Sequence, residues 1–247
     1  MSRHPHDGRG QMLKAVAGGL ALLAMPYAAS VAATWYRYGQ TRALTRRAGS
    51  PGGALIDRFM PSFEVAERHE IQVDAPVEYT FAAARAMDVN RSALVRAVFA
   101  VRTLPSRLRG APARQASAPL LEETLALGWR ILAETAGREV VVGAVTQPWR
   151  AEVKFRAVDP DAFAGFAEPG YAKIVWTLEA LPLGPASSRF RTQTRVSTTD
   201  PRARALFRRY WAALSPGIRL IRRESLKLVK GDAERRFQAS TAEPAIR

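Results

Sequence analysis

The stretch GFAEPGYAKIVWTLEA brings an acid, a phenol and an amine close together in the chain. Glu168, Tyr171 and Lys173 are residue types that serve as general acids, general bases or nucleophiles. Successive side chains of a strand point to opposite faces, so Lys173 is expected on the outer face and Trp176 and Leu178 on the inner one. Glu168 falls in the preceding turn. The pattern predicts the rim of a pocket, with Tyr171 near it, and no catalytic cluster.

Glu67 and His69 are better acid/base candidates. They stand two residues apart in FEVAERHEIQV, whose alternation of apolar and polar residues predicts a strand, and both fall on its apolar face. A buried carboxylate beside an imidazole can exchange protons, because burial and proximity bring such pKa values toward neutrality. The alternative is a polar pair bonded to a nearby Arg or Thr, without a chemical role.

Alternation and helical spacing predict further residues on the wall of a pocket. In RFRTQTRVST the threonines fall on the inner face, where they could orient a ligand or simply belong to a β core. A later helix has an aromatic apolar face, which could equally be core. The expected lining residues, besides Glu67, His69, Tyr171, Trp176 and Leu178, are Trp129, Ile131, Phe190, Thr192, Thr194, Phe207, Tyr210 and Trp211.

Several kinds of site are excluded or disfavoured by composition. The chain has 247 residues and no cysteine, so disulfides, thiolate metal sites and cysteine nucleophiles are excluded. Its histidines are His4, His6 and His69, too few in the folded part for a zinc site. No G-x-S-x-G motif occurs, and the glycines of GGLALLAMP lie in a hydrophobic stretch. We therefore expect no metal and no cofactor.

A hydrophobic segment lies near the N-terminus. No charged residue occurs between Lys14 and Arg37, and about 20 apolar residues suffice to cross a bilayer. Trp35 and Tyr36 at its end are typical of an interfacial anchor. The sequence predicts a single-pass membrane anchor over residues 15–36. The alternative is a cleaved signal peptide, which would leave a secreted or periplasmic protein.

The chain is strongly basic, with a formal net charge of +15 and a pI near 11.1. This balance favours anionic partners, although an arginine-rich composition also follows from a genome rich in G and C. An anionic membrane surface is the expected partner, and nucleic acid is the least favoured one, because no nucleic-acid-binding motif occurs. The basic residues expected to face the membrane are Arg208, Arg209, Arg219, Arg222 and Arg223.

The order of predicted elements is a strand, two helices, a run of antiparallel strands and a long C-terminal helix, which is an α+β layout. A proline after Ser215 is expected to interrupt the last helix. The predicted organisation is a basic tail, a hydrophobic segment, a linker, one ligand-binding domain and a C-terminal tail, over residues 1–14, 15–36, 37–60, 61–232 and 233–247.

The stretches VDAPVEYTFAA, GYAKIVWTLEAL with SRFRTQTRVSTTD, and FRRYWAALSPGIRLIRR resemble the bacterial SRPBCC group. This START-like superfamily includes polyketide cyclases/dehydrases and the birch pollen allergen. The resemblance implies a helix-grip fold, in which a seven-stranded antiparallel sheet surrounds a C-terminal helix and encloses a deep hydrophobic cavity. We therefore expect a membrane-tethered module that binds a hydrophobic small molecule or lipid. The alternatives are a cyclase or dehydratase that uses Glu67 and His69, and a non-catalytic scaffold.

Overall fold

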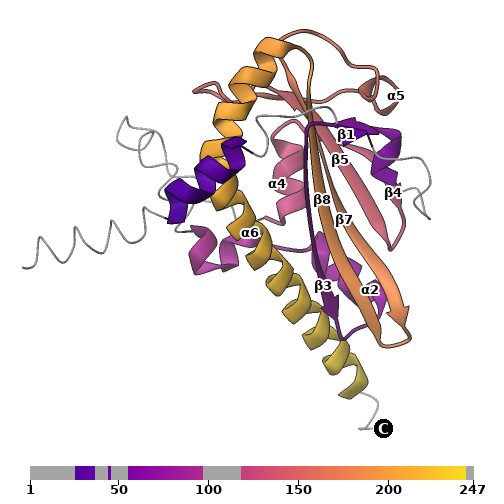
Figure 1. Ribbon diagram of the computed structural model, residues 1–247. Helices are drawn as coiled ribbons and strands as arrows, with labels where there is room; N and C mark the ends of the chain where they lie inside the picture. The colour runs from indigo at the N-terminus through magenta and orange to yellow at the C-terminus, as the bar shows by residue number, and fades with distance from the viewer. Residues whose placement is uncertain (1–25, 37–43, 46–54, 97–117, 243–247) are drawn as a thin grey trace, which may run out of the picture.

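The computed structural model describes residues 26–36, 44–45, 55–96 and 118–242 (Figure 1). Its main element is an antiparallel six-stranded sheet in the order β3-β8-β7-β5-β4, with the short β6 paired to β5. The strands are β3 (Val65–Val73), β4 (Arg130–Thr135), β5 (Glu139–Thr146), β6 (Phe155–Arg156), β7 (Ala172–Gly184) and β8 (Ser187–Thr198). A separate pair joins β1 (Leu44–Thr45) to β2 (Ser62–Phe63).

One long helix runs along the sheet, and shorter helices lie around it (Figure 1). The helices are α2 (Val77–Arg85), α4 (Leu120–Ala126), α5 (Pro160–Phe163) and α6 (Pro201–Ala242), with single-turn η1 (Leu55–Arg58) and η2 (Val89–Arg91). Residues 26–36 and 93–96 are also helical. The predicted α+β class is confirmed. The main sheet has six strands where seven were expected, and it is open, with β3 and β4 at its edges.

The first turn of α6 has the predicted cap. Asp200 Oδ1 accepts hydrogen bonds from the backbone N–H groups of Arg202 and Ala203, at 2.8 and 2.9 Å, and Pro201 needs no such bond. The predicted interruption at Pro216 is wrong, because α6 continues through it for 42 residues in all. A proline inside a helix costs about 3 kcal/mol. The adjacent Ser215 is fully buried and lies 3.4 Å from Thr34 of the helical residues 26–36, so tertiary contacts support the helix at this point.

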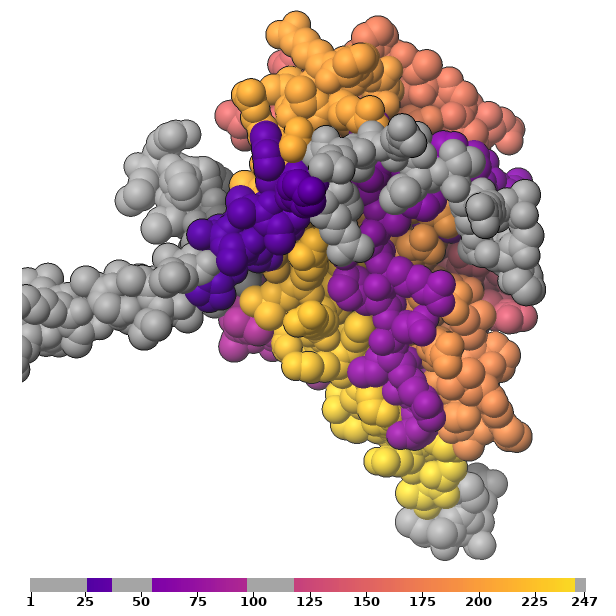
Figure 2. Space-filling model, viewed as in Figure 1, coloured from indigo at the N-terminus to yellow at the C-terminus, as the bar shows by residue number. Residues whose placement is uncertain are grey.

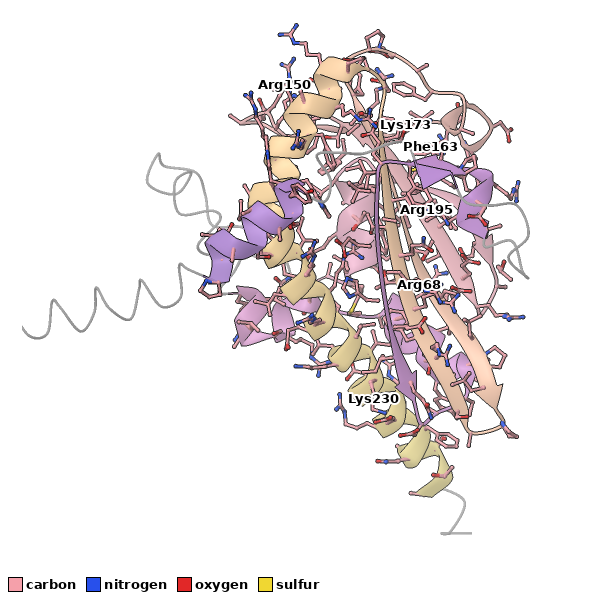
Figure 3. The ribbon with its side chains drawn as sticks, in the orientation of Figure 1. Arg68, Arg150, Phe163, Lys173, Arg195 and Lys230 are labelled. Carbon is pink, nitrogen blue, oxygen red and sulfur yellow. The ribbon has the colours of Figure 1, made fainter. Side chains whose placement is uncertain are left out.

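The last turns of α6 extend past residue 232, where the sequence predicts a tail. The ring of Phe237 lies 5.4 Å from that of Tyr79 on α2, and the Tyr79 hydroxyl donates to Ser240 Oγ at 2.8 Å. Closer to the sheet, Lys230 Nζ donates to the backbone oxygen of Gln72 at 3.1 Å (Figure 3). These contacts hold the C-terminal end of α6 against β3 and α2.

Both faces of the sheet are buried. The inner face, defined here as the one toward α6, carries the largest apolar cluster, which includes Val140, Val142, Leu178 and Phe190 together with residues of α2 and α6. The outer face is covered by α5 and by η1 with the residues after it, through the buried Ile56, Phe59, Met60 and Phe163. Residues 37–60 were expected to be a linker, but residues 55–60 pack as core, because their apolar side chains recur at helical spacing.

The prediction of a membrane anchor over residues 15–36 is wrong. In the part of the chain that the structure describes, no helix is both long and apolar enough to cross a bilayer. The helical residues 26–36 lie against α6 instead (Figure 2). Thr34 is buried there, 3.4 Å from Ser215 Oγ, and Arg208 lies 4.0 Å above the ring of Trp35. Residues 15–25 lie outside the described ranges, and the signal-peptide alternative stays a prediction.

Candidate functional site

One row of residues crosses the inner face of the sheet from edge to edge. Glu67 on β3 pairs with Thr194 on β8, which pairs with Trp176 on β7. Trp176 pairs with Val142 on β5, and Val142 pairs with Ile131 on β4. Side chains of directly paired residues lie on the same face. The row is therefore polar over β3 and β8, under α6, and apolar over the other strands.

The polar end of this row belongs to a group that we call the inner polar cluster: Glu67, His69, Thr192, Thr194, Arg219 and Arg222. Pairing of His69 with Thr192 places a second polar row beside the first. Arg219 and Arg222 are three residues apart on α6, so both reach the same part of the sheet. The cluster thus forms where the longest helix crosses the edge of the sheet.

Hydrogen bonds join the cluster across the two layers. Arg219 donates from Nε and Nη2 to Glu67 Oε1, at 3.2 and 3.1 Å. Arg222 donates from Nη1 to Thr192 Oγ1 at 3.4 Å and from Nη2 to Thr194 Oγ1. His69 Nε2 lies 3.7 Å from Glu67 Oε2, which is too long for a hydrogen bond. The expected pair of Glu67 and His69 is therefore present, but Glu67 is bound by arginine.

Burial changes the charge state of the cluster. It lowers the pKa of His69, and the positive charge of Arg222 acts in the same direction, while Glu67 opposes the change. Burial also lowers the pKa of Arg222 to about 10, which leaves its guanidinium protonated at neutral pH. At neutral pH the cluster therefore contains two guanidinium groups, one carboxylate and a neutral imidazole that can accept a proton or a hydrogen bond.

Two buried nitrogen atoms of the cluster have no hydrogen-bond partner within the described ranges: His69 Nε2 and Arg222 Nε. No carboxylate of a described residue lies within ion-pair distance of Arg222. The side chains of Glu67, His69 and Arg219 are 13%, 16% and 27% exposed, so solvent reaches the cluster. The cluster thus holds two buried nitrogen atoms whose hydrogen-bonding capacity is unused within the described part of the chain.

The apolar end of the row is only partly closed. Trp129, Ile131 and Trp176 are partly buried against the main core, whereas Leu178 and Phe190 are fully buried within it. Of the residues expected on the pocket wall, the first three keep accessible surface and the last two belong to the core. Aromatic and aliphatic side chains of this kind are typical of small-molecule sites.

A groove of about 540 Å³ lies between α6 and the segment after β5. Its apolar lining consists of Pro148, Trp149, Ala151, Val153, Leu206, Tyr210 and Leu214, and Arg150 and Arg209 complete it. Trp149 and Tyr210 also pack with Ile174 and Ile218, which lie between α6 and β7. Ile174 and Trp176 lie on the same face of β7, two residues apart. The groove therefore adjoins the inner face next to Trp176. Phe207 and Trp211, also expected on the wall, are buried beneath it with ring centroids 5.9 Å apart.

Tyr171 lies apart from the inner face. It packs in the outer-face cluster, 5.1 Å from the guanidinium of Arg156, and lines an open, basic pocket of about 610 Å³ with Gln147, Arg150, Ala151, Glu152, Lys154 and Arg156. Glu168 accepts from Arg156 Nη2 at 2.6 Å. Lys173 Nζ donates to the backbone oxygen of Ala164 at 2.7 Å, beside Phe163 (Figure 3), and burial lowers its pKa. These contacts give the three residues structural roles.

The residues expected on a membrane-facing surface fall into two groups. In the first group, Arg208 stacks on the ring of Trp35 and Arg219 forms an ion pair with Glu67. Arg222 belongs to the same group and donates hydrogen bonds to Thr192 and Thr194. Arg209 and Arg223 are exposed. An anionic surface as partner stays a prediction for these two residues.

Two arginines have positions that the sequence alone did not reveal. Arg195 lies on the outer face, as strand alternation predicts, but it is only 2% exposed and pairs with Asp57 Oδ1 at 2.7 Å (Figure 3). The apolar spacing of LIDRFM was the available signal that this face is covered. For Arg222, the signal was its position three residues after Arg219 on one helix face.

Among the described residues, no three His, Asp or Glu side chains are grouped closely enough to hold a metal ion. An open antiparallel sheet with a long C-terminal helix across its inner face is the helix-grip arrangement expected from the sequence.

No protein-family model matches the chain, and no curated protein matches its sequence. Among solved structures, the chain is similar to a conserved protein from Geobacillus kaustophilus, with 11% identity and a TM-score of 0.33 over 69% of this chain and 96% of that one. It is also similar to the Zhui aromatase/cyclase from Streptomyces sp. R1128, with 15% identity and a TM-score of 0.28 over 70% and 94%. A START superfamily protein from Mycobacterium smegmatis has 12% identity and a TM-score of 0.25 over 70% and 97%.

Proposed function

We propose that the protein binds a hydrophobic small molecule or lipid between α6 and the inner face of the sheet. The observation that carries the proposal is the groove of about 540 Å³ beside α6, most of whose lining is apolar. Its volume lies in the range of about 300 to 1,000 Å³ that is usual for small-molecule sites. Partly buried side chains on the inner face, including Ile174 and Trp176, extend the apolar surface beyond the groove.

The energetics favour a ligand that uses both parts of this surface. Each Å² of apolar surface removed from water contributes about 25 cal/mol, so about 300 Å² would contribute roughly 7 kcal/mol. Association and ordering costs subtract several kcal/mol from that sum. A molecule confined to the groove would bind weakly, whereas one that also contacts the partly buried Ile174 and Trp176 gains additional contact area.

A fluorescence titration tests this proposal with the neutral apolar probe N-phenyl-1-naphthylamine. We expect saturable enhancement with wild-type protein and a loss of affinity of about tenfold in Leu214→Gln, which places an amide in the groove. Leu183→Gln is the matched control, because Leu183 is 45% exposed on the β7–β8 hairpin and lines neither of the two pockets described above. Absence of saturable binding to the wild type would contradict the proposal, and would favour the scaffold alternative.

An enzyme of the cyclase or dehydratase kind is the alternative that the inner polar cluster favours. His69 is neutral at neutral pH because burial lowers its pKa, and its Nε2 atom has no hydrogen-bond partner among the described residues. It could therefore accept a proton, with Glu67 beside it. If polyketide-like substrates are turned over, His69→Ala should abolish turnover and leave probe binding intact. Wild-type protein that binds the probe and turns over no such substrate would count against the enzyme.

A further inference from the structure

The groove beside α6 combines an apolar lining with two arginines, one from each of its walls. On the helix, Leu206, Tyr210 and Leu214 recur at intervals of four residues and therefore share a face. Arg209 lines the groove beside them. The opposite wall is the segment after β5, where Arg150 lies beside the first half of α6 (Figure 3). A ligand in the groove would therefore meet apolar side chains and a guanidinium group on both walls.

Neither of these two arginines is neutralised by an acidic side chain of the described residues. Arg150 and Arg209 are exposed, and no described carboxylate lies within ion-pair distance of either. The lining of the groove contains no Asp or Glu. By contrast, Arg156 in the neighbouring basic pocket pairs with Glu168 at 2.6 Å. The groove therefore has two positive charges that the described part of the chain does not compensate.

The basic pocket of about 610 Å³ adds to the positive charge at the rim of the groove. Arg150 and Ala151 line both the pocket and the groove, so the two adjoin along this part of the chain. Lys154 and Arg156 add two cations to the pocket, and Glu152 is the acid in its lining. An anionic group beside Arg150 would therefore be attracted by charges from both the groove and the pocket.

We propose that the ligand is an amphiphilic anion, whose apolar body lies against Tyr210 and Leu214 and whose anionic group lies at the rim of the groove with Arg150 and Arg209. This inference rests on the proposed function and specifies the class of ligand. Guanidinium groups bind oxyanions well, because their donors form a planar fork. Since both arginines are exposed, the anionic group keeps part of its hydration, and binding avoids the cost of burying a charge.

Two fluorescent probes with the same carbon skeleton test the preference for an anion. The compound 8-anilinonaphthalene-1-sulfonate differs from N-phenyl-1-naphthylamine by one sulfonate group, which stands in for the anionic group of the ligand. We expect the sulfonate to bind about tenfold more tightly at low ionic strength, because charge-assisted hydrogen bonds are stronger than neutral ones. The preference should fall to roughly twofold in about 0.5 M NaCl, since salt screens exposed charges.

Substitution of the two arginines shows whether the preference arises in the groove. Arg150→Gln and Arg209→Gln should each lower the affinity for the sulfonate about threefold, and the double variant should lose the preference while its affinity for the neutral probe is unchanged. Because both arginines are exposed, the variants should fold. Arg223→Gln is the matched control, because it removes the same charge from an exposed position of α6 outside the groove. The control excludes a general effect of the net charge of +15.

The outcomes separate this inference from the proposed function. If the neutral probe does not bind, the proposed function fails. If both probes bind equally tightly at low ionic strength, or if the preference survives in the double variant, the proposed function stands and the amphiphilic anion is overturned. A membrane surface is the other occupant that the same charges could fit. If phosphatidylglycerol vesicles bind the wild type but not the double variant, whereas the two probes bind equally, the arginines contact a lipid surface and the inference fails.

Discussion

Arg219 and Glu67 join the long helix to the edge strand of the sheet, with two arginine nitrogens 3.2 and 3.1 Å from one carboxylate oxygen. The contact lies at the level of the inner face where α6 crosses β3. It engages one carboxylate oxygen of Glu67 and holds the helix against the inner polar cluster.

Replacing Glu67 should weaken this connection. In Glu67→Gln the carboxylate charge is lost and Arg219 and Arg222 remain close together without compensation, so we expect a loss of about 1 to 3 kcal/mol in the free energy of unfolding. Urea denaturation measures it. Glu152→Gln is the control, because Glu152 and Lys154 form an exposed pair, 82% and 80% accessible, and its removal should change stability very little. Equal effects of the two substitutions would contradict the structural role of Glu67.

Arg195 should be one of the most sensitive charged residues of the chain. It is 2% exposed, pairs with Asp57, donates to the Met60 backbone oxygen at 2.8 Å and lies 4.6 Å from the ring of Phe63. Arg195→Gln should cost about 3 kcal/mol, since several buried partners lose their donor. Arg189→Gln on the same strand, whose side chain is 38% exposed, should cost less than about 1 kcal/mol.

A similar loss for the two arginine variants in urea denaturation would show that η1 does not cover Arg195. Selective loss in Arg195→Gln, accompanied by faster proteolysis near residues 55–60, would show that the outer face depends on this ion pair. The second readout matters because the proteolysis site reports where the structure opens.

The raised pKa of Glu139 predicts how the stability of the fold changes with pH. Burial, with the charge of Glu179 on the neighbouring strand, raises the pKa of Glu139 from 4.5 to about 7. The raised value means that the protonated form stabilises the fold. This contribution is complete below pH 4.5 and is lost as the pH rises toward 7. After allowance for partial exposure, we expect the loss to be about 1 to 2 kcal/mol.

Glu139→Gln keeps a neutral side chain at every pH and should therefore be more stable than wild type at about pH 8 and nearly equal to it at about pH 4. Thermal unfolding at several pH values measures the difference. Glu78→Gln, at an exposed position of α2, serves as the control and should leave the pH dependence unchanged. A wild-type stability curve that is flat relative to Glu139→Gln would contradict the raised pKa.

Trp176 should be required for ligand binding more than for folding. Its side chain is partly buried in the middle of the inner face, so Trp176→Ala should weaken binding of N-phenyl-1-naphthylamine at least about tenfold. Phe166→Ala is matched in burial but lies on the outer face, and it should leave probe binding unchanged. If both variants bind the probe like wild type, the ligand does not lie on the inner face.

The two faces of the sheet could be predicted from the sequence, because successive side chains of a strand point to opposite faces. Thr192, Thr194 and Trp176 lie on the face toward α6, and Lys173 lies on the other face, as alternation predicts. Their role in binding stays a prediction. The period of a strand determines which face a residue occupies, but it contains no information on what covers that face.

The features that the sequence did not reveal depend on packing between distant segments. Pro216 predicted a break in a helix, yet α6 is continuous there, with the adjacent Ser215 buried against Thr34. The hydrophobic stretch before Arg37 predicted a membrane span, whereas its described residues pack on α6 through Thr34 and Trp35. Arg222 looked like a surface charge, because only the crossing of α6 over β8 shows that it points at two threonines.

The most direct test of ligand binding between α6 and the inner face is a crystal structure with N-phenyl-1-naphthylamine, at a concentration that saturates its fluorescence. We predict electron density for one probe molecule per chain in the groove lined by Trp149, Tyr210 and Leu214, on the side of the groove toward Ile174. Density only at another surface, with the inner face empty at saturating ligand, would contradict the account.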